Sequence, residues 1–121
     1  MPVKRDPSKP YSRAHRGENR SGSLKYLSLE CPHPVPKVPD GIVFDADMRK
    51  TWRHLWKGPH GNMWDEAYAH EVAAYVLLTH QLYAGKGSAL VASERGKLST
   101  QLGLTPVALR ALGFALEGDT A

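Results

Sequence analysis

Near the C-terminal end of the chain, a helix stop is followed at once by a helix start. Gly103 can adopt the left-handed conformation that closes a helix. Shortly after it, Thr105 is a good N-cap, and Pro106 loses no hydrogen bond in the first turn of a helix. The stretch therefore predicts two helices joined by a tight turn, one over residues 89–102 and one over residues 106–117.

An amphipathic helix is predicted over residues 46–57. Asp45 precedes it as an N-cap, and the pair Gly58-Pro59 ends it. Its large apolar residues recur at helical spacing. They predict one buried stripe, formed by Met48, Trp52, Leu55 and Trp56.

A longer helix is predicted over residues 63–84, with Asn62 as its N-cap and Gly85 at its end. Its apolar residues cover more than one face, so the helix needs neighbours on two sides. In a chain of 121 residues, one of those neighbours can be another copy of the chain. The residues that we expect at this oligomer interface are Trp64, Tyr68, Val72, Tyr75 and Leu82.

No stretch of the chain alternates polar and apolar residues for long enough to indicate a strand. The expected fold class is therefore all-α, with a four-helix core in an oligomerisation domain over residues 45–121. Residues 1–44 differ in composition. Their first 25 residues are basic and almost free of apolar side chains, which predicts a disordered arm.

Four prolines follow the arm and predict an extended, semi-rigid spacer: Pro32, Pro34, Pro36 and Pro39. A proline-rich ligand for another domain is the alternative interpretation of this stretch.

Positive charge is concentrated in the N-terminal half. Residues 1–60 contain 12 Lys and Arg against 6 Asp and Glu, whereas residues 61–121 contain 4 against 6. This distribution favours a polyanionic partner, and it predicts contacts with DNA phosphates rather than with bases. The candidate DNA-binding residues are Lys4, Arg5, Lys9, Arg13, Arg16, Arg20 and Lys25 in the arm, and Arg49, Lys50, Arg53 and Lys57 on the first helix. A solubilising tail and a solvated helix face are the alternative.

No constellation of residues supports catalysis, so we expect no enzyme activity, no metal and no cofactor. His70 lacks the second histidine four residues later that a zinc-binding helix needs, since Ala74 stands there. The single cysteine, Cys31, lies among prolines without a held base, and it indicates a reducing compartment. No apolar run approaches membrane-spanning length, so we expect no membrane partner.

The two C-terminal helices also have the spacing of a DNA-reading helix-turn-helix, with Ser99, Gly103 and Leu109 at the expected positions. A recognition helix needs polar side chains that reach base edges, and here only Arg110 can do so. We therefore expect the last helix to pack against the helix over residues 63–84 or against a neighbouring subunit. A small helix-turn-helix transcriptional regulator is the alternative function, and an interaction adaptor that docks through the proline-rich spacer is a third.

In combination, these motifs resemble those of the small terminase subunits of tailed bacteriophages. The matching elements are Trp-x-x-Leu-Trp at residues 52–56, a break at Gly58-Pro59, Trp64-Asp65, a long apolar helix, and Leu-Gly-Leu-Thr-Pro at residues 102–106. The resemblance covers about residues 45–116.

The resemblance implies a non-catalytic subunit that forms rings and binds double-stranded viral DNA. Such a subunit delivers the DNA to the large terminase subunit, which carries the ATPase and the nuclease. The expected location is the host cytoplasm during virion assembly.

Overall fold

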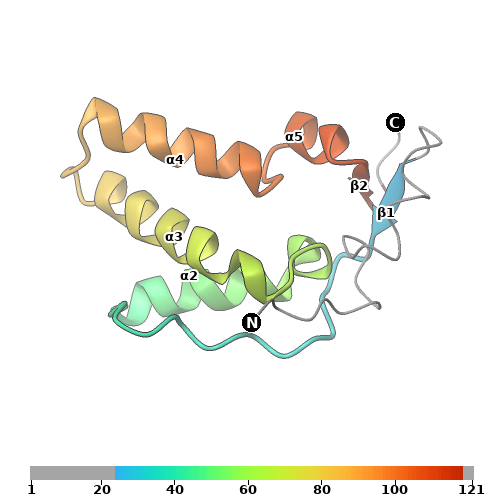
Figure 1. The fold of residues 1–121 in the computed structure, drawn as a ribbon, viewed down its shortest axis with the longest axis horizontal. Coiled ribbons are helices and arrows are strands. Elements are labelled where there is room, and N and C mark those ends of the chain that lie inside the picture. Colours follow the sequence, from blue (N-terminus) through green and yellow to red (C-terminus); the bar gives the residue numbers. More distant parts are fainter. Residues whose placement is uncertain (1–23, 119–121) are drawn as a thin grey trace.

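Four α-helices make up most of the fold in residues 24–118, the part of the chain that the computed structural model describes (Figure 1). They are α2 (Ala46–Lys57), α3 (Ala69–Tyr83), α4 (Ala89–Gln101) and α5 (Pro106–Ala111). The expectation of a mostly helical fold is confirmed.

Helix α3 is the central element, because it packs against both α2 and α4 (Figure 1). Thr51 on α2 and the Nε2 atom of His80 on α3 form a hydrogen bond of 2.9 Å. On the other side, Arg95 of α4 donates to the Oγ1 atom of Thr79 at 3.0 Å and to the hydroxyl of Tyr75 at 2.8 Å. Helices α3 and α4 form an antiparallel hairpin, and α2 lies along the opposite side of α3.

The prediction that the second helix begins at residue 63 with Asn62 as its cap was wrong. Two short 3-10 helices, η2 (Pro59–Asn62) and η3 (Glu66–Tyr68), fill this stretch. Asp65 is extended, and its carboxylate accepts a 2.9 Å hydrogen bond from the backbone N–H of Ala67. The amide of Asn62 instead donates to the carbonyls of two N-terminal residues, Ser28 and Glu30, at 3.0 Å each.

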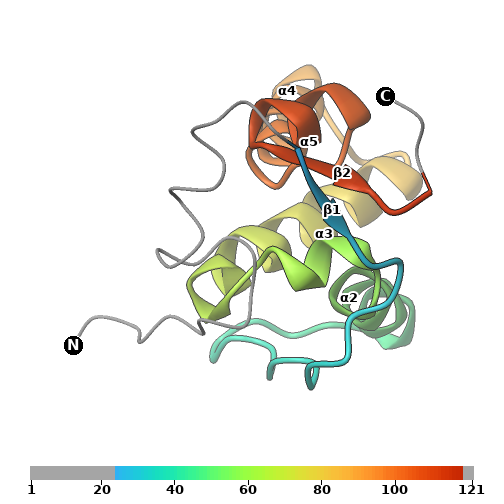
Figure 2. The ribbon, with the colours of Figure 1, turned by 90° about the vertical axis from the view of Figure 1, so that its right-hand side faces the viewer.

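The last helix ends earlier than predicted, at Ala111. Gly113 then adopts a φ of 93°, and the chain continues as strand β2 (Phe114–Leu116). This strand pairs in parallel with β1 (Lys25–Leu27), with Lys25 opposite Phe114 (Figure 2). Burial favours this arrangement, since Phe114 and Leu27 are both almost completely buried.

The proline-rich segment is part of the helical domain, so the predicted boundary at residue 45 was wrong. Residues 28–44, which we call the strap, run along α2 (Figure 1). The indole N–H of Trp52 donates to the carbonyl of Pro36 at 3.0 Å, and the backbone N–H of Cys31 donates to the carbonyl of Lys57 at 2.9 Å. Cys31 and Phe44 are buried. The prolines leave the strap without helix or strand, as expected.

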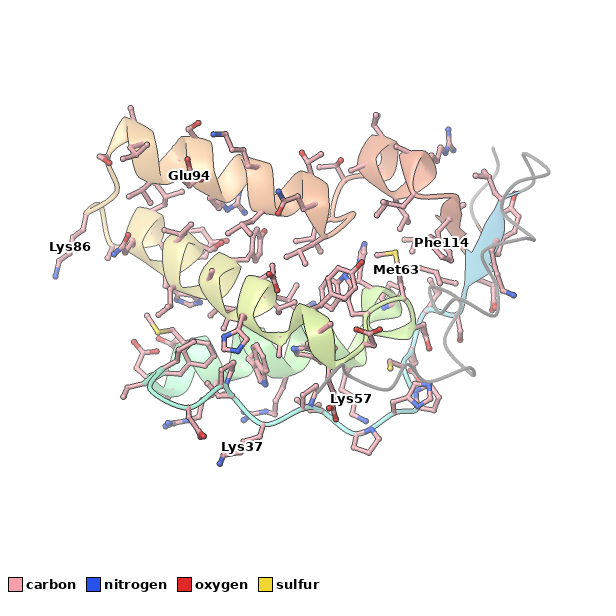
Figure 3. All side chains as sticks on the ribbon, viewed as in Figure 1. Lys37, Lys57, Met63, Lys86, Glu94 and Phe114 are labelled. Carbon is pink, nitrogen blue, oxygen red and sulfur yellow. The ribbon has the colours of Figure 1, made fainter. Side chains whose placement is uncertain are left out.

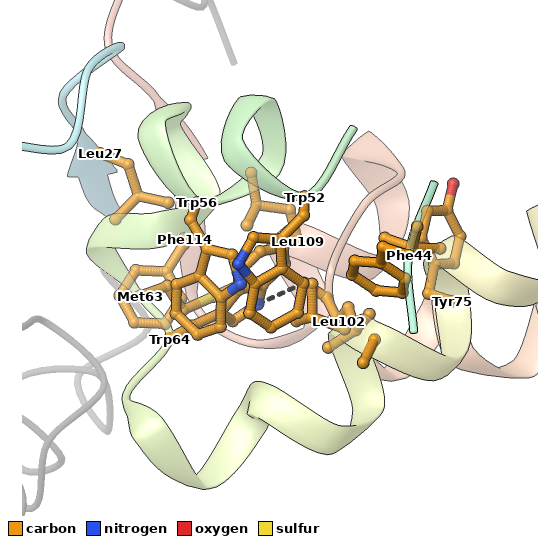
Figure 4. Packing of buried hydrophobic residues seen from close by; sticks show 13 residues of the cluster. Leu27, Phe44, Trp52, Trp56, Met63, Trp64, Tyr75, Leu102, Leu109 and Phe114 are labelled. Carbon is orange, nitrogen blue, oxygen red and sulfur yellow. Dashed lines mark hydrogen bonds between the residues drawn. The ribbon is translucent and has the colours of Figure 1, made fainter. Parts of the chain in front are cut away.

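A row of aromatic rings forms the centre of the core (Figure 4). The ring centroids of Trp52 and Trp56 lie 5.6 Å apart, and those of Trp56 and Trp64 lie 5.2 Å apart. Such tilted pairs stabilise a fold by about 0.5–1.5 kcal/mol each beyond the area that they bury. The buried stripe predicted for the first helix is therefore confirmed at Trp52 and Trp56, while Met48 and Leu55 are half-buried.

The turn between α4 and α5 has the predicted caps. Gly103 has a φ of 72°, and the Oγ1 atom of Thr105 accepts from the backbone N–H of Ala108 at 3.2 Å. Gly103 is also buried, and a Cβ atom there would lie 3.0 Å from Leu112 Cδ1 and 3.1 Å from Met63 Cε. A side chain at this site would be strained by the backbone conformation, and it would also have to push aside the ends of the Leu112 and Met63 side chains.

The two effects can be separated with matched glycine variants. Gly85 has nearly the same φ of 73° but no atom within 4 Å of an added Cβ. Gly85→Ala should lower the free energy of unfolding by about 1 kcal/mol, and Gly103→Ala by about 2–4 kcal/mol, measured by urea unfolding. As a control of opposite sign, Gly96→Ala in the open middle of α4 should stabilise by about 0.5–1 kcal/mol. Equal losses at Gly85 and Gly103 would contradict the packing argument.

Candidate nucleic-acid interface

The outer surface of α2 carries four exposed basic side chains: Arg49, Lys50, Arg53 and Lys57. Arg49, Arg53 and Lys57 follow one another at intervals of four residues, so they lie along one side of the helix. Asp47 is the one acidic residue of α2. The helix turns this charged surface outward because Trp52 and Trp56 hold its other side in the core. The grouping predicted from the sequence is therefore present.

Two of the four cations are occupied by the strap. The guanidinium Nη1 atom of Arg49 donates to the carbonyl of Phe44 at 2.9 Å. The Nζ atom of Lys57 donates to the carbonyl of His33, also at 2.9 Å. These bonds join α2 to positions near the two ends of the strap. Sequence reasoning missed this role, because nothing in the spacing distinguishes a cation that binds a carbonyl from one that binds a phosphate.

Lys50 and Arg53 are the remaining cations of this face, and within residues 24–118 neither has a hydrogen-bond or ion-pair partner. The nearby strap adds Lys37, which pairs with Asp40 at 3.3 Å. Figure 3 shows Lys37 and Lys57 along the same lower edge of the molecule. Both side chains of the Lys37–Asp40 pair are more than four-fifths exposed, so the pair contributes little stability and does not fix Lys37.

The predicted arm residues Lys4, Arg5, Lys9, Arg13, Arg16 and Arg20 lie outside the described residues. Lys25 does not belong to a disordered segment, so its assignment to the arm was wrong. It opens strand β1, is half-buried, and its backbone N–H donates to the carbonyl of Gly113 at 2.9 Å. The pairing with β2 fixes the backbone of Lys25 in the fold.

The predicted oligomer interface is largely part of the protomer's own core. Trp64 and Val72 have no exposed surface, and Tyr75 is 9% exposed with its hydroxyl bound to Arg95. These three residues offer almost no area to another copy, so their assignment to an interface was wrong. Tyr68 and Leu82 are half-buried, and their assignment stays a prediction.

The α4–α5 pair does not present a base-reading surface. Helix α5 has six residues, of which Ala108 and Leu109 are buried. Its exposed residues are Pro106, Val107, Arg110 and Ala111, so Arg110 is the one long polar side chain on it. Recognition helices place several polar side chains against base edges. This short helix does not.

Within residues 24–118, no three His, Cys, Asp or Glu residues are grouped as metal ligands. In the same range, no helix combines the length and the apolar character needed to cross a bilayer. Comparisons with protein-family models, with curated proteins and with solved structures give no match to this chain.

His60 is the described histidine with a perturbed pKa. Its ring stacks on Trp64 at a centroid distance of 5.8 Å. Burial lowers the pKa of His60 from its usual 6.5, and a hydrogen bond with the backbone of Gly103 opposes this in part. Below pH 6.5 the unfolded chain therefore binds this proton more readily than the folded chain does. Neutral His60 stabilises the fold, and that contribution is lost as the pH falls.

Replacing His60 tests this coupling. In the wild type, the free energy of unfolding should fall between about pH 7.5 and 5.5, whereas His60→Gln should show a smaller fall. Exposed His70→Gln serves as the control and should keep the wild-type dependence. Urea unfolding followed by tryptophan fluorescence measures all three. An unchanged pH dependence in His60→Gln would show that the ring titrates equally in both states.

Proposed function

We propose that this protein is the non-catalytic small terminase subunit of a phage DNA-packaging motor. In this role it binds double-stranded viral DNA, forms a homo-oligomeric ring, and recruits or regulates the large terminase subunit with its ATPase and nuclease. It acts in the host cytoplasm during virion assembly.

One observation carries the DNA-binding part of this proposal. Lys50 and Arg53 point outward from α2 without partners among the described residues, on a helix with four basic side chains and one acidic side chain. An unpaired cation on a rigid helix can meet a phosphate without first breaking another interaction. Arg49 and Lys57 bind the strap and hold the surface in shape.

The N-terminal residues support the same partner. Residues 1–23 contain six basic and two acidic residues, so they add four positive charges to each copy. A ring would place many such segments around one DNA molecule, and each bound segment would raise the effective concentration of the next. Weak phosphate contacts of one copy would then become strong binding by the assembly.

The Leu-Gly-Leu-Thr-Pro motif at residues 102–106 supports the family assignment through the resemblance described above. Its physical role in the fold is the tight turn between α4 and α5. The short α5 with one long polar side chain speaks against the transcriptional regulator, because such a helix offers little to read a base sequence.

Removing residues 1–23 tests the arm, and the deletion keeps every helix and strand of the described fold, since strand β1 begins at Lys25. Binding of a short random DNA duplex should weaken, and the slope of log K against log salt should become less steep by up to about 5. Fluorescence anisotropy between about 50 and 200 mM salt measures both quantities. If the shortened protein binds random DNA as the full chain does, the arm has no part in DNA binding.

Neutralising the two free cations of α2 tests the helix. The double variant Lys50→Gln/Arg53→Gln should lower the salt slope by about 2 per bound protomer. The control is Lys86→Gln/Lys97→Gln, which also removes two positive charges, one from the α3–α4 turn and one from α4. Figure 3 shows Lys86 at the end of the molecule away from Lys57. Equal losses in the two double variants would mean that net charge, and not the α2 surface, governs binding.

A further inference from the structure

Leu29 is an exposed aliphatic side chain on a rigid backbone. It is 55% exposed, although it lies between residues that are firmly attached to the fold. The amide of Asn62 donates to the carbonyls on both sides of it, those of Ser28 and Glu30, at 3.0 Å each. Just beyond, Cys31 is buried and bonded through its backbone to Lys57. The structure therefore presents Leu29 to solvent without the freedom to turn it inward.

The neighbouring Glu30 adds a charge to this feature. It is exposed, and within residues 24–118 its carboxylate has no ion-pair partner. The loop thus displays an aliphatic group next to an unpaired carboxylate. The exposed part of Leu29 gives the protomer no stability, since the hydrophobic effect favours only the surface that is buried.

A small apolar pocket with an arginine at its edge lies at the α4–α5 turn. Its walls include Leu104, Leu109, Ala115 and Leu116, with His60 and Arg110 also lining it. Its volume is about 60 Å³, against about 10–15 Å³ for one water and about 150 Å³ for a cavity that holds benzene. The pocket has room for the methyl end of one aliphatic side chain, and it is too small for a nucleotide or a cofactor.

Arg110 supplies the complementary charge. It is exposed in the last turn of α5, and within the described residues its guanidinium has no hydrogen-bond or ion-pair partner. A guanidinium beside an apolar pocket selects a carboxylate beside an aliphatic group, because planar Arg–carboxylate pairs add direction to the apolar contact.

We propose that Leu29 of one copy inserts into the α4–α5 pocket of a second copy, with Glu30 paired to Arg110. The occupant is thus a second copy of this chain. The inference rests on the proposed function in one respect, since it names the contact between copies that a ring requires.

The contact is tested by measuring mass against concentration, by sedimentation or light scattering, with the full chain. Leu29→Ser should raise the dissociation constant of self-association by about tenfold or more. The matched control is Val43→Ser, at an aliphatic residue that is 86% exposed and lies just before α2. This control should associate as the wild type does.

Exchanging the charges of Glu30 and Arg110 tests the contact more specifically than the Leu29 variant does. Glu30→Arg and Arg110→Glu should each weaken association by placing like charges together, and the double variant should restore it because the pair is re-formed in reverse order. Rescue of this kind cannot come from loss of folding in a single variant.

Failure of this contact is distinguishable from failure of the proposed function. If the wild type associates and all these variants associate equally, the Leu29 contact is wrong and the ring forms elsewhere. If the wild type stays monomeric at high concentration, both the contact and the ring are wrong. Binding to the random duplex, measured separately, then decides whether the DNA-binding part stands.

Discussion

A buried hydrogen bond connects the two halves of this fold. The indole N–H of Trp64 donates to the carbonyl of Leu102 at 3.1 Å. That carbonyl lies at the C-terminal end of α4, where no intrahelical N–H can reach it, and leaving it unpaired in the core would cost about 1–3 kcal/mol. Trp64 must therefore point at the end of α4, and this contact ties the chain between α2 and α3 to the α4–α5 turn.

This constraint also determines what remains on the surface. With Trp52, Trp56 and Trp64 packed in one row, the opposite side of α2 is left to its basic residues. The strap then covers part of that side and takes up two of the cations through backbone carbonyls. The division of the four cations into two that hold the strap and two that face solvent thus follows from how the core is filled.

Local signals in the sequence predicted the elements that depend on local interactions. Asp45 and Thr105 cap their helices as expected, because a cap and its N–H partner are only three residues apart. The spacing of the basic residues on α2 was likewise readable from the helical period.

Features that depend on distant partners were not predictable in this way. Asn62 looks like a helix cap until Ser28 and Glu30 are placed beside it, and no local pattern does so. Strands β1 and β2 have three residues each and pair across most of the chain. Trp64 is a large aromatic residue of the kind that is common at interfaces, and only its burial and its hydrogen bond to the end of α4 show that it belongs to the core.

The position of Arg110 links the turn to the proposed contact between copies. On a DNA-reading helix an arginine would have polar neighbours, but here it stands beside a small apolar pocket. The protruding Leu29 and this pocket are different surfaces of one protomer, so a contact between them is heterologous unless two copies exchange both at once. A reciprocal exchange gives a closed dimer. A one-way contact repeats from copy to copy, and it gives a closed ring only if the rotation between neighbouring copies is a whole fraction of 360°. The proposed ring requires the second case.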